Sequence, residues 1–477
     1  MVQQEFASKD PESAAAALRK DVSLFSRSSL SWLAADWTAP PVRRTNSTLG
    51  VPSEGRSRWP AAVGHLVCLQ VGAGVLALPY AVSQLGLLAG PLLIVASVAA
   101  AMLCGLLLTH AYRGPMGERR PTYRAAIAAV LGPRAAGAVT AAIYLTFFAV
   151  SVAYTVLAAD SMAYIARTAC GMRGVPKDGW CFEYIWAMVL IFSAVQLVLA
   201  QLPNLESTAA IMALGALMSI GYSLLAMVFC LAGAPARLGS LGGRPAPPAA
   251  KAMGVLNAIG TVLFSNSAPI IVIDVQHTLR EPPESRVSMS KAVYVSFALT
   301  MVFYAVTGVT GYLALGDAVS PNVLTSFQFD GPATAWVPLL ANVMVLVHLV
   351  PAYQVVAQPL FVGIEAALVR WFPRLESMPE APVRLVYRTL YVCVTAVISA
   401  TLPFFASIAG LIGAISFWPT IVYAPIAMYL KIKKPRPAVA VALRAVNWAA
   451  FALALGALVG SAYEFAAASK SFRPFGM

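Results

Sequence analysis

The sequence predicts an all-α polytopic membrane protein with eleven transmembrane helices: a five-plus-five inverted repeat and one extra helix. Of its 477 residues, 59% are hydrophobic and only 11% are charged. Eleven apolar segments follow a polar N-terminal region, and about 20 apolar residues suffice to cross a bilayer. The first and sixth segments are interrupted near their midpoints. Two interrupted spans in corresponding positions of two halves are typical of inverted-repeat transporters.

The chain divides into a tail, a transporter domain and a short C-terminus. Residues 1–60 are polar, serine-rich and basic, with no apolar signal sequence, so we expect a disordered cytosolic tail. The transporter domain is expected over residues 61–468, followed by an extracytosolic C-terminus at 469–477. Its apolar segments lie at residues 61–83, 87–111, 137–166, 184–202, 208–233, 252–274, 290–316, 335–366, 386–402, 404–430 and 439–468.

The repeats follow from this spacing. A linker rich in proline and glycine, 234–250, separates the first repeat (61–233) from the second (252–430). The last segment, 439–468, is then the extra helix. Between the second and third segments, Tyr123–Leu131 is expected to form a short interfacial helix.

The distribution of basic residues predicts the orientation. If the N-terminus is cytosolic, the tail and inner loops carry 25 Lys and Arg residues and the outer segments carry 8. This asymmetry follows the positive-inside rule. It explains the net charge of +13 without a nucleic-acid partner. The six cysteines have no metal-ligand spacing, and no nucleotide loop or nucleophile motif is present, so we expect no enzyme, metal or cofactor.

The first segment contains Gly72, Ala73 and Gly74 at its midpoint and Pro79 five residues later. Glycine and proline weaken a helix, and opened backbone within a membrane is tolerated where it lines a cavity. The amides from Gly72 to Val75 would begin a half-helix whose positive end can bind a carboxylate. The alternative is that these small residues only let helices pack closely.

The sixth segment repeats this interruption with Ser265, Asn266, Ser267 and Pro269. Carbonyl groups from Phe264 to Asn266, together with the Ser265 hydroxyl, could accept hydrogen bonds from an ammonium group. The two interruptions therefore predict one site for a zwitterionic solute near the middle of the membrane.

Four blocks resemble the amino acid/auxin permease family, and within it the plant-type amino acid permeases. They are GAGVLALPYAVSQLGLLAGP in the first span, Ala258–Ala292 (especially IVIDVQHTLREPPE), Gly311–Glu365, and LPFFASIAGLIGAISFWPTIVYAPIAMYL at Leu402–Leu430. The resemblance implies a proton-coupled amino acid symporter with the fold of the amino acid–polyamine–organocation superfamily. It places the protein in a plasma membrane, although the ALPYA sequence is closer to the vacuolar and lysosomal branches and leaves endomembranes open.

Four residues are candidates for proton coupling. His65 and His348 match histidines of the resembling permeases, and each has a structural hydrogen bond as its alternative role. His65 lies two turns before Gly72 and is expected to be buried among apolar neighbours. Asp160 could neutralise a substrate ammonium or pair with Arg167. Asp274 stands at the inner end of the sixth span, where the family usually has glutamate. It could be a gate residue or only a solvated residue at the helix end.

Cys170 and Cys181 flank the outer loop between the third and fourth spans, where the family often carries a cysteine pair. We therefore expect a disulfide between them, because an extracytosolic loop permits oxidation.

Two other functions remain open from the sequence. An amino acid sensor signalling through the 60-residue tail would bind its ligand without moving it. A sodium-coupled transporter would use main-chain oxygens and hydroxyl groups that this chain also contains.

Overall fold

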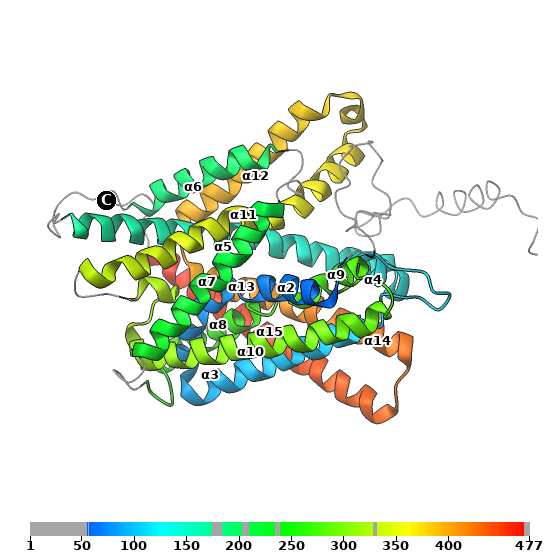
Figure 1. The fold of residues 1–477 in the computed structure, drawn as a ribbon, viewed down its shortest axis with the longest axis horizontal. Helices are drawn as coiled ribbons and strands as arrows, with labels where there is room; N and C mark the ends of the chain where they lie inside the picture. The colour runs from blue at the N-terminus through cyan, green and yellow to red at the C-terminus, as the bar shows by residue number, and fades with distance from the viewer. Residues whose placement is uncertain are drawn as a thin grey trace, which may run out of the picture.

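The computed structural model describes residue 55 and residues 57–173, 184–202, 209–233, 239–327 and 332–471. Regular structure in these ranges is helical, apart from two isolated β-bridges (Figure 1). The α-helices are α2 (Trp59–Gln70), α3 (Ala73–Leu108), α4 (Tyr123–Leu131), α5 (Pro133–Met172), α6 (Ile185–Ala200), α7 (Ala209–Gly233), α8 (Pro248–Phe264), α9 (Val272–Thr278), α10 (Ser285–Leu315), α11 (Pro332–Trp371), α12 (Glu380–Thr401), α13 (Phe405–Ser416), α14 (Ala424–Lys433) and α15 (Pro437–Ser471).

Among the described residues, eight helical stretches are long and apolar enough to cross a membrane. Two shorter apolar helices accompany them, Ile185–Ala200 and Leu217–Ala232. The chain is thus an integral multi-pass membrane protein. The count of eleven spans stays a prediction, as does the division into repeats.

A sharp turn at Gly86 divides α3 into two arms. Gly86 has φ +86°, a conformation that side-chain-bearing residues rarely adopt. A Cβ at Gly86 would lie 2.1 Å from the carbonyl oxygen of Leu241, so the linker packs directly on the turn. The Arg244 amide donates to the Ser83 carbonyl at 2.6 Å, and Lys251 Nζ donates to the Gln84 carbonyl at 2.8 Å. Because residue 86 is glycine, the linker can pack against this turn, and its hydrogen bonds hold the end of the first span in place.

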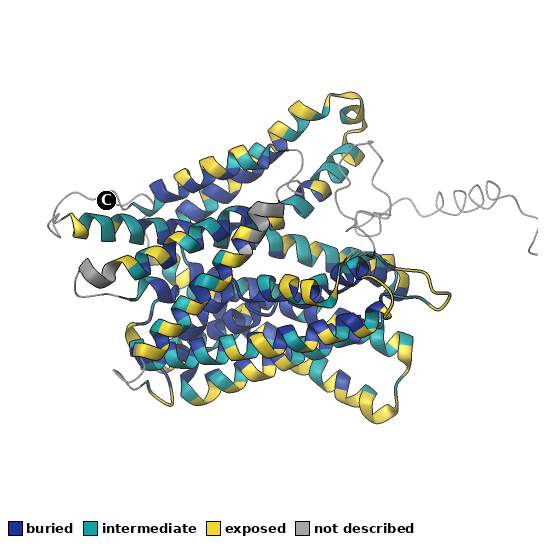
Figure 2. Ribbon diagram, in the orientation of Figure 1, coloured by how far each residue is buried: buried dark blue, intermediate teal, exposed yellow. Residues whose placement is uncertain are grey.

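The interrupted span α8–α9 lies at the centre of the bundle. α8 packs against α3, α13 and α15, and 78% of the apolar stretch of α8–α9 is buried. Figure 2 shows this concentration of buried residues in the middle of the bundle. Only 17% of the apolar stretch of α15 is buried, so most of its residues lie outside the packed core. A π-helical segment, Phe417–Tyr423, links α13 to α14.

At one end of the bundle, the predicted cytosolic end, α4 lies beside α9 (Figure 1). The expected helix at Tyr123–Leu131 has these bounds in the structure. Thr122 caps it by accepting from the Ala125 amide at 3.2 Å. Gly132, with φ +99°, and Pro133 then start α5.

The same end carries an ion cluster on the loops. Glu281 Oε2 lies 2.5 Å from Arg113 Nη2 and 3.4 Å from Arg119 Nη2. The hydrogen bond from Arg113 lowers the pKa of Glu281 to about 2. Since the pKa is depressed, Glu281 stays ionised above that pH, and its contribution to stability is lost progressively as pH falls from 4.5 through about 2. The cluster is therefore charged throughout the physiological range.

Candidate substrate site at the two interrupted helices

The first interruption lies between α2 and α3. The Val71 amide still donates to the Val67 carbonyl at 2.7 Å, and helical geometry resumes at Ala73. Ala73 and Gly74 occupy the first two positions of α3, where amides have no carbonyl partner within the helix. These amides and the helix dipole make a site for negative charge.

The second interruption separates α8 from α9. α8 ends at Phe264, a 3₁₀ segment spans Ala268–Ile271, and α9 follows. The Ser267 hydroxyl donates to the Phe264 carbonyl at 3.0 Å. Each carbonyl retains a second lone pair, so this backbone can still accept from a cation.

The two interruptions contact each other directly. The Ser265 hydroxyl donates to the Gly74 carbonyl at 3.2 Å. A Cβ at Gly74 would lie 2.9 Å from Ser265 Oγ and 3.0 Å from Ser265 Cα. Only glycine lets these backbones approach so closely, which sharpens the role of Gly74 beyond what the sequence indicated.

Tyr304 of α10 joins both interruptions and was not a candidate from the sequence. Its buried hydroxyl lies 2.7 Å from the carbonyl oxygen of Gln70 and also contacts the carbonyl oxygen of Ser265. A tyrosine hydroxyl carries one proton, so it donates to one of these carbonyls at a time. Tyr304 therefore ties the end of α2 to the end of α8.

Tyr304→Phe is expected to slow amino acid uptake about three- to ten-fold, since a hydrogen bond contributes about 0.5–1.5 kcal/mol. Initial uptake rates in vesicles would measure the effect. Tyr294→Phe is the matched control, because Tyr294 lies on the exposed face of the same helix. Equal rates for Tyr304→Phe and wild type would remove Tyr304 from the site.

A cavity of about 100 Å³ opens beside the interruptions. One side is polar and is formed by Gln70, Ala73, Gly74, Ser265 and Ser267. The other side is apolar and comes from α5 and α11, with Phe147, Val150, Tyr154, Val355 and Val356. The arrangement suits a small solute with charged groups at one end and an apolar side chain at the other.

Gln70 adds a donor that the sequence did not single out. Thr300 Oγ1 donates to Gln70 Oε1 at 3.1 Å, which fixes the side-chain amide. Gln70 Nε2 is buried without a hydrogen-bond partner in the described structure, although Gln70 lines the cavity. A buried donor without a partner costs free energy unless a ligand satisfies it.

Predicted site residues divide between those near the cavity and those away from it. Ala73, Gly74, Phe264 and Ser265 line it. Val75 is fully buried and does not line it, because α3 turns its side chain into the packed core. Asn266 also points elsewhere: its Nδ2 donates to the Ser97 hydroxyl at 3.2 Å and to the Val262 carbonyl at 3.0 Å.

His348 of α11 lies against the first interruption. A Cβ at Gly72 would be 3.7 Å from its Nε2, while its Nδ1 lies 3.0 Å from the Gly215 carbonyl oxygen on α7. A carbonyl can only accept, so Nδ1 carries the hydrogen and Nε2 has the lone pair in the neutral ring. From α7, the Ser219 hydroxyl also donates to the Val71 carbonyl. The titratable nitrogen of His348 thus faces the interruption.

The expected burial of His65 is wrong. The buried face of α2 carries Ala62, Leu66, Val67 and Gln70, and His65 lies on the exposed face. Seven residues correspond to nearly two helical turns, but the two faces differ because helical geometry ends at Gln70. His65 therefore lies outside the packed core and does not line the central cavity.

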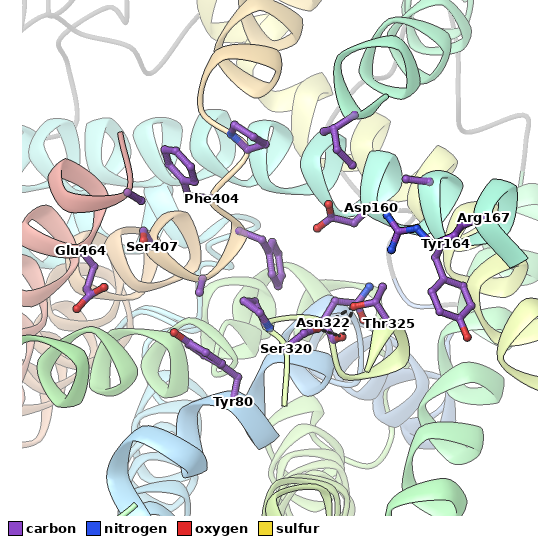
Figure 3. Close-up of a pocket in the computed structure, with 17 residues that line it drawn as sticks. Tyr80, Asp160, Tyr164, Arg167, Ser320, Asn322, Thr325, Phe404, Ser407 and Glu464 are labelled. Carbon is purple, nitrogen blue, oxygen red and sulfur yellow. Dashed lines mark hydrogen bonds between the residues drawn. The ribbon is translucent and has the colours of Figure 1, made fainter. Parts of the chain in front are cut away.

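The two aspartates lie away from the central cavity. Asp274 Oδ2 accepts from the Tyr123 amide at 3.2 Å, so Asp274 stabilises the positive N-terminus of α4. Asp160 lines a separate cavity of about 450 Å³ near the other end of α5, together with Arg167, Tyr80 and Glu464. Figure 3 shows Asp160 and Glu464 on opposite sides of this cavity.

Cys170 is disulfide-bonded. Its predicted partner, Cys181, lies outside the described residues. Cys68, Cys104, Cys230 and Cys393 are free: Cys104 and Cys230 are buried, Cys68 is partly buried and Cys393 is exposed.

Comparison with solved structures shows the fold class. The chain resembles MhsT, solved in complex with L-phenylalanine, with a TM-score of 0.53 and 14% identity over 85% of this chain and 100% of that one. It also resembles the inward-facing conformation of Mhp1, with a TM-score of 0.50 and 16% identity over 89% and 95% of the two chains. Both likenesses show the inverted-repeat fold class predicted from the two interrupted helices.

Comparison of sequences identifies the family. Residues 55–466 match the family model described as "Transmembrane amino acid transporter protein". Amino acid permease 3 of Arabidopsis thaliana is 34% identical over 88% of this chain and 92% of its own length. Amino acid permease 2 of the same plant is 32% identical over 87% and 89%. The chain therefore belongs to the transmembrane amino acid transporter family, within the plant amino acid permeases, and is a transporter of amino acids rather than an enzyme.

Proposed function

We propose that this permease carries amino acids by proton symport and alternating access, with His348 as the coupling residue. The observation that carries the proposal is the position of His348 Nε2, 3.7 Å from where a Cβ at Gly72 would lie. One titratable group thereby adjoins the backbone that would bind the substrate.

The substrate's carboxylate is assigned to the Ala73 and Gly74 amides and to Gln70 Nε2. Its ammonium is assigned to the backbone carbonyls of Phe264 and Ser265. Helix termini provide this complementarity without mobile charges, as in other transporters with interrupted helices. The apolar wall from α5 and α11 would receive the side chain.

Coupling between the proton and the substrate would follow from their opposite charges. A proton on Nε2 of His348 would place a cation beside the carboxylate site, where it favours substrate binding. By reciprocal linkage, a bound carboxylate would favour protonation by the same factor. Release of one would weaken binding of the other, which is the behaviour that symport requires. His65, on the exposed face of α2, offers no comparable contact.

A panel of radiolabelled amino acids tests this function in proteoliposomes, with and without sodium and with an imposed pH gradient. Concentrative uptake driven by an inward proton gradient without sodium is the expected result. Uptake that needs sodium and ignores the pH gradient would exclude proton symport. Binding without flux would exclude transport and favour a sensor.

We further propose a cytosolic N-terminus and a plasma-membrane address. The excess of Lys and Arg in the tail and in the loops on the α4 side supports the orientation, by the positive-inside rule. An epitope tag in the loop after Lys433 should be inaccessible to antibody in intact cells. Labelling of that tag without permeabilisation would reverse the orientation.

A further inference from the structure

A third cavity lies between α5 and α11 and has no part in the proposed transport site. Its volume is about 270 Å³. Small residues on one face of each helix leave this space: Gly137 and Ala141 on α5, and Gly363 and Ala367 on α11. Each pair is four residues apart, one turn along its helix. The ring of Tyr144 covers Gly363, where a Cβ would lie 2.5 Å from Tyr144 Cε2.

The cavity combines an apolar interior with a basic rim. Arg124 of α4 and Arg370 of the last turn of α11 both line it, beside the exposed indole of Trp371. Among the described residues that line it, none is acidic. Glu365, five residues before Arg370, accepts from the Tyr387 hydroxyl at 3.2 Å and does not line the cavity.

The cavity lies at the end of the bundle where α4 ends and α5 begins. Tryptophan is enriched where a helix leaves the hydrocarbon core, so Trp371 marks this level of the membrane. By the predicted orientation, the cavity opens toward the cytosolic leaflet. That leaflet is the anionic one, and basic pockets between transmembrane helices on that side bind anionic headgroups.

We propose that this cavity binds an anionic glycerophospholipid, with an acyl chain between α5 and α11 and the phosphate between Arg124 and Arg370. Guanidinium groups bind phosphate oxygens through paired hydrogen bonds. A soluble anion would gain nothing from the apolar interior. A zwitterionic lipid would present the two arginines with a compensating cation. An anionic lipid matches both the apolar interior and the basic rim of the cavity.

Binding of phosphatidylglycerol to the purified full-length protein tests the proposal, because it needs no transport measurement. Native mass spectrometry would compare dioleoyl phosphatidylglycerol with dioleoyl phosphatidylcholine at equal concentrations. Arg370→Gln is expected to weaken phosphatidylglycerol binding about five-fold, and the Arg124→Gln/Arg370→Gln double variant about twenty-fold. Arg374→Gln is the matched control, since this exposed arginine lies four residues on and does not line the cavity.

The apolar half is tested with Ala367→Trp, which fills the cavity and should reduce phosphatidylglycerol binding in protein of unchanged melting temperature. Arg370→Gln alone suffices if the double variant does not fold, because Arg370 is exposed. Equal affinity for the two lipids, or unchanged binding by Arg370→Gln, would overturn the proposal. Full competition by inorganic phosphate would also overturn it, by identifying a soluble-anion site.

Discussion

Gly74→Val is expected to reduce amino acid uptake about 100-fold while leaving expression and targeting intact. The new side chain would begin 3.0 Å from Ser265 Cα and 2.9 Å from Ser265 Oγ, which forces the two interruptions apart. Overpacking of this kind costs about 1–3 kcal/mol, and the displaced amides no longer share one site, so uptake should fall about 100-fold. Initial rates of radiolabelled amino acid uptake would measure the loss.

Gly64→Val is its matched control. Gly64 lies in α2, on the same span, and no atom lies within 4 Å of a Cβ built there. This variant should transport at the wild-type rate. If Gly74→Val also transported normally, the backbone at the first interruption could not be the carboxylate site.

His348→Asn is expected to remove proton-driven accumulation. A gradient of one pH unit corresponds to about 1.4 kcal/mol, which supports roughly ten-fold accumulation at one proton per amino acid. Asparagine can still donate to the Gly215 carbonyl but cannot titrate. The accumulation ratio should therefore fall to about one and the pH dependence of uptake should flatten. Exchange of internal for external amino acid should survive, because it requires no release of the proton.

His65→Asn provides the comparison for this variant. His65 is exposed on α2, so its replacement should leave accumulation and the pH profile unchanged. The reverse outcome, with a normal His348→Asn and a defective His65→Asn, would move coupling to α2 and contradict the role assigned to His348.

The interrupted helices could be predicted from the sequence because backbone features left a local trace. Glycine at 72 and 74 and the polar residues at 265–267 are anomalies within apolar segments, and the membrane makes such anomalies costly. The apolar segments and the Tyr123–Leu131 helix could likewise be predicted, because each depends on residues that are close together in the sequence. Local composition therefore indicated both the fold class and the general location of the site.

The side chains that complete the site could not be predicted in the same way. Tyr304 and Gln70 are unremarkable in sequence. Their importance arises because Tyr304 contacts Gln70, which is 234 positions away, and Ser265, which is 39 positions away. Asn266 shows the converse: Nδ2 of a polar side chain at an interruption donates to Ser97 of a neighbouring arm, and the residue does not line the cavity. The expected burial of His65 was wrong because the face of a half-helix cannot be extrapolated past the point where its geometry ends.

Movement of protons with the amino acid is the most direct test of symport centred on His348. Proteoliposomes would contain a pH-sensitive dye in sodium-free buffer, with equal pH on both sides, and a transported amino acid would then be added outside. We expect acidification of the lumen with the wild type and none with His348→Asn. Amino acid entry by the wild type without any change in luminal pH would contradict proton symport.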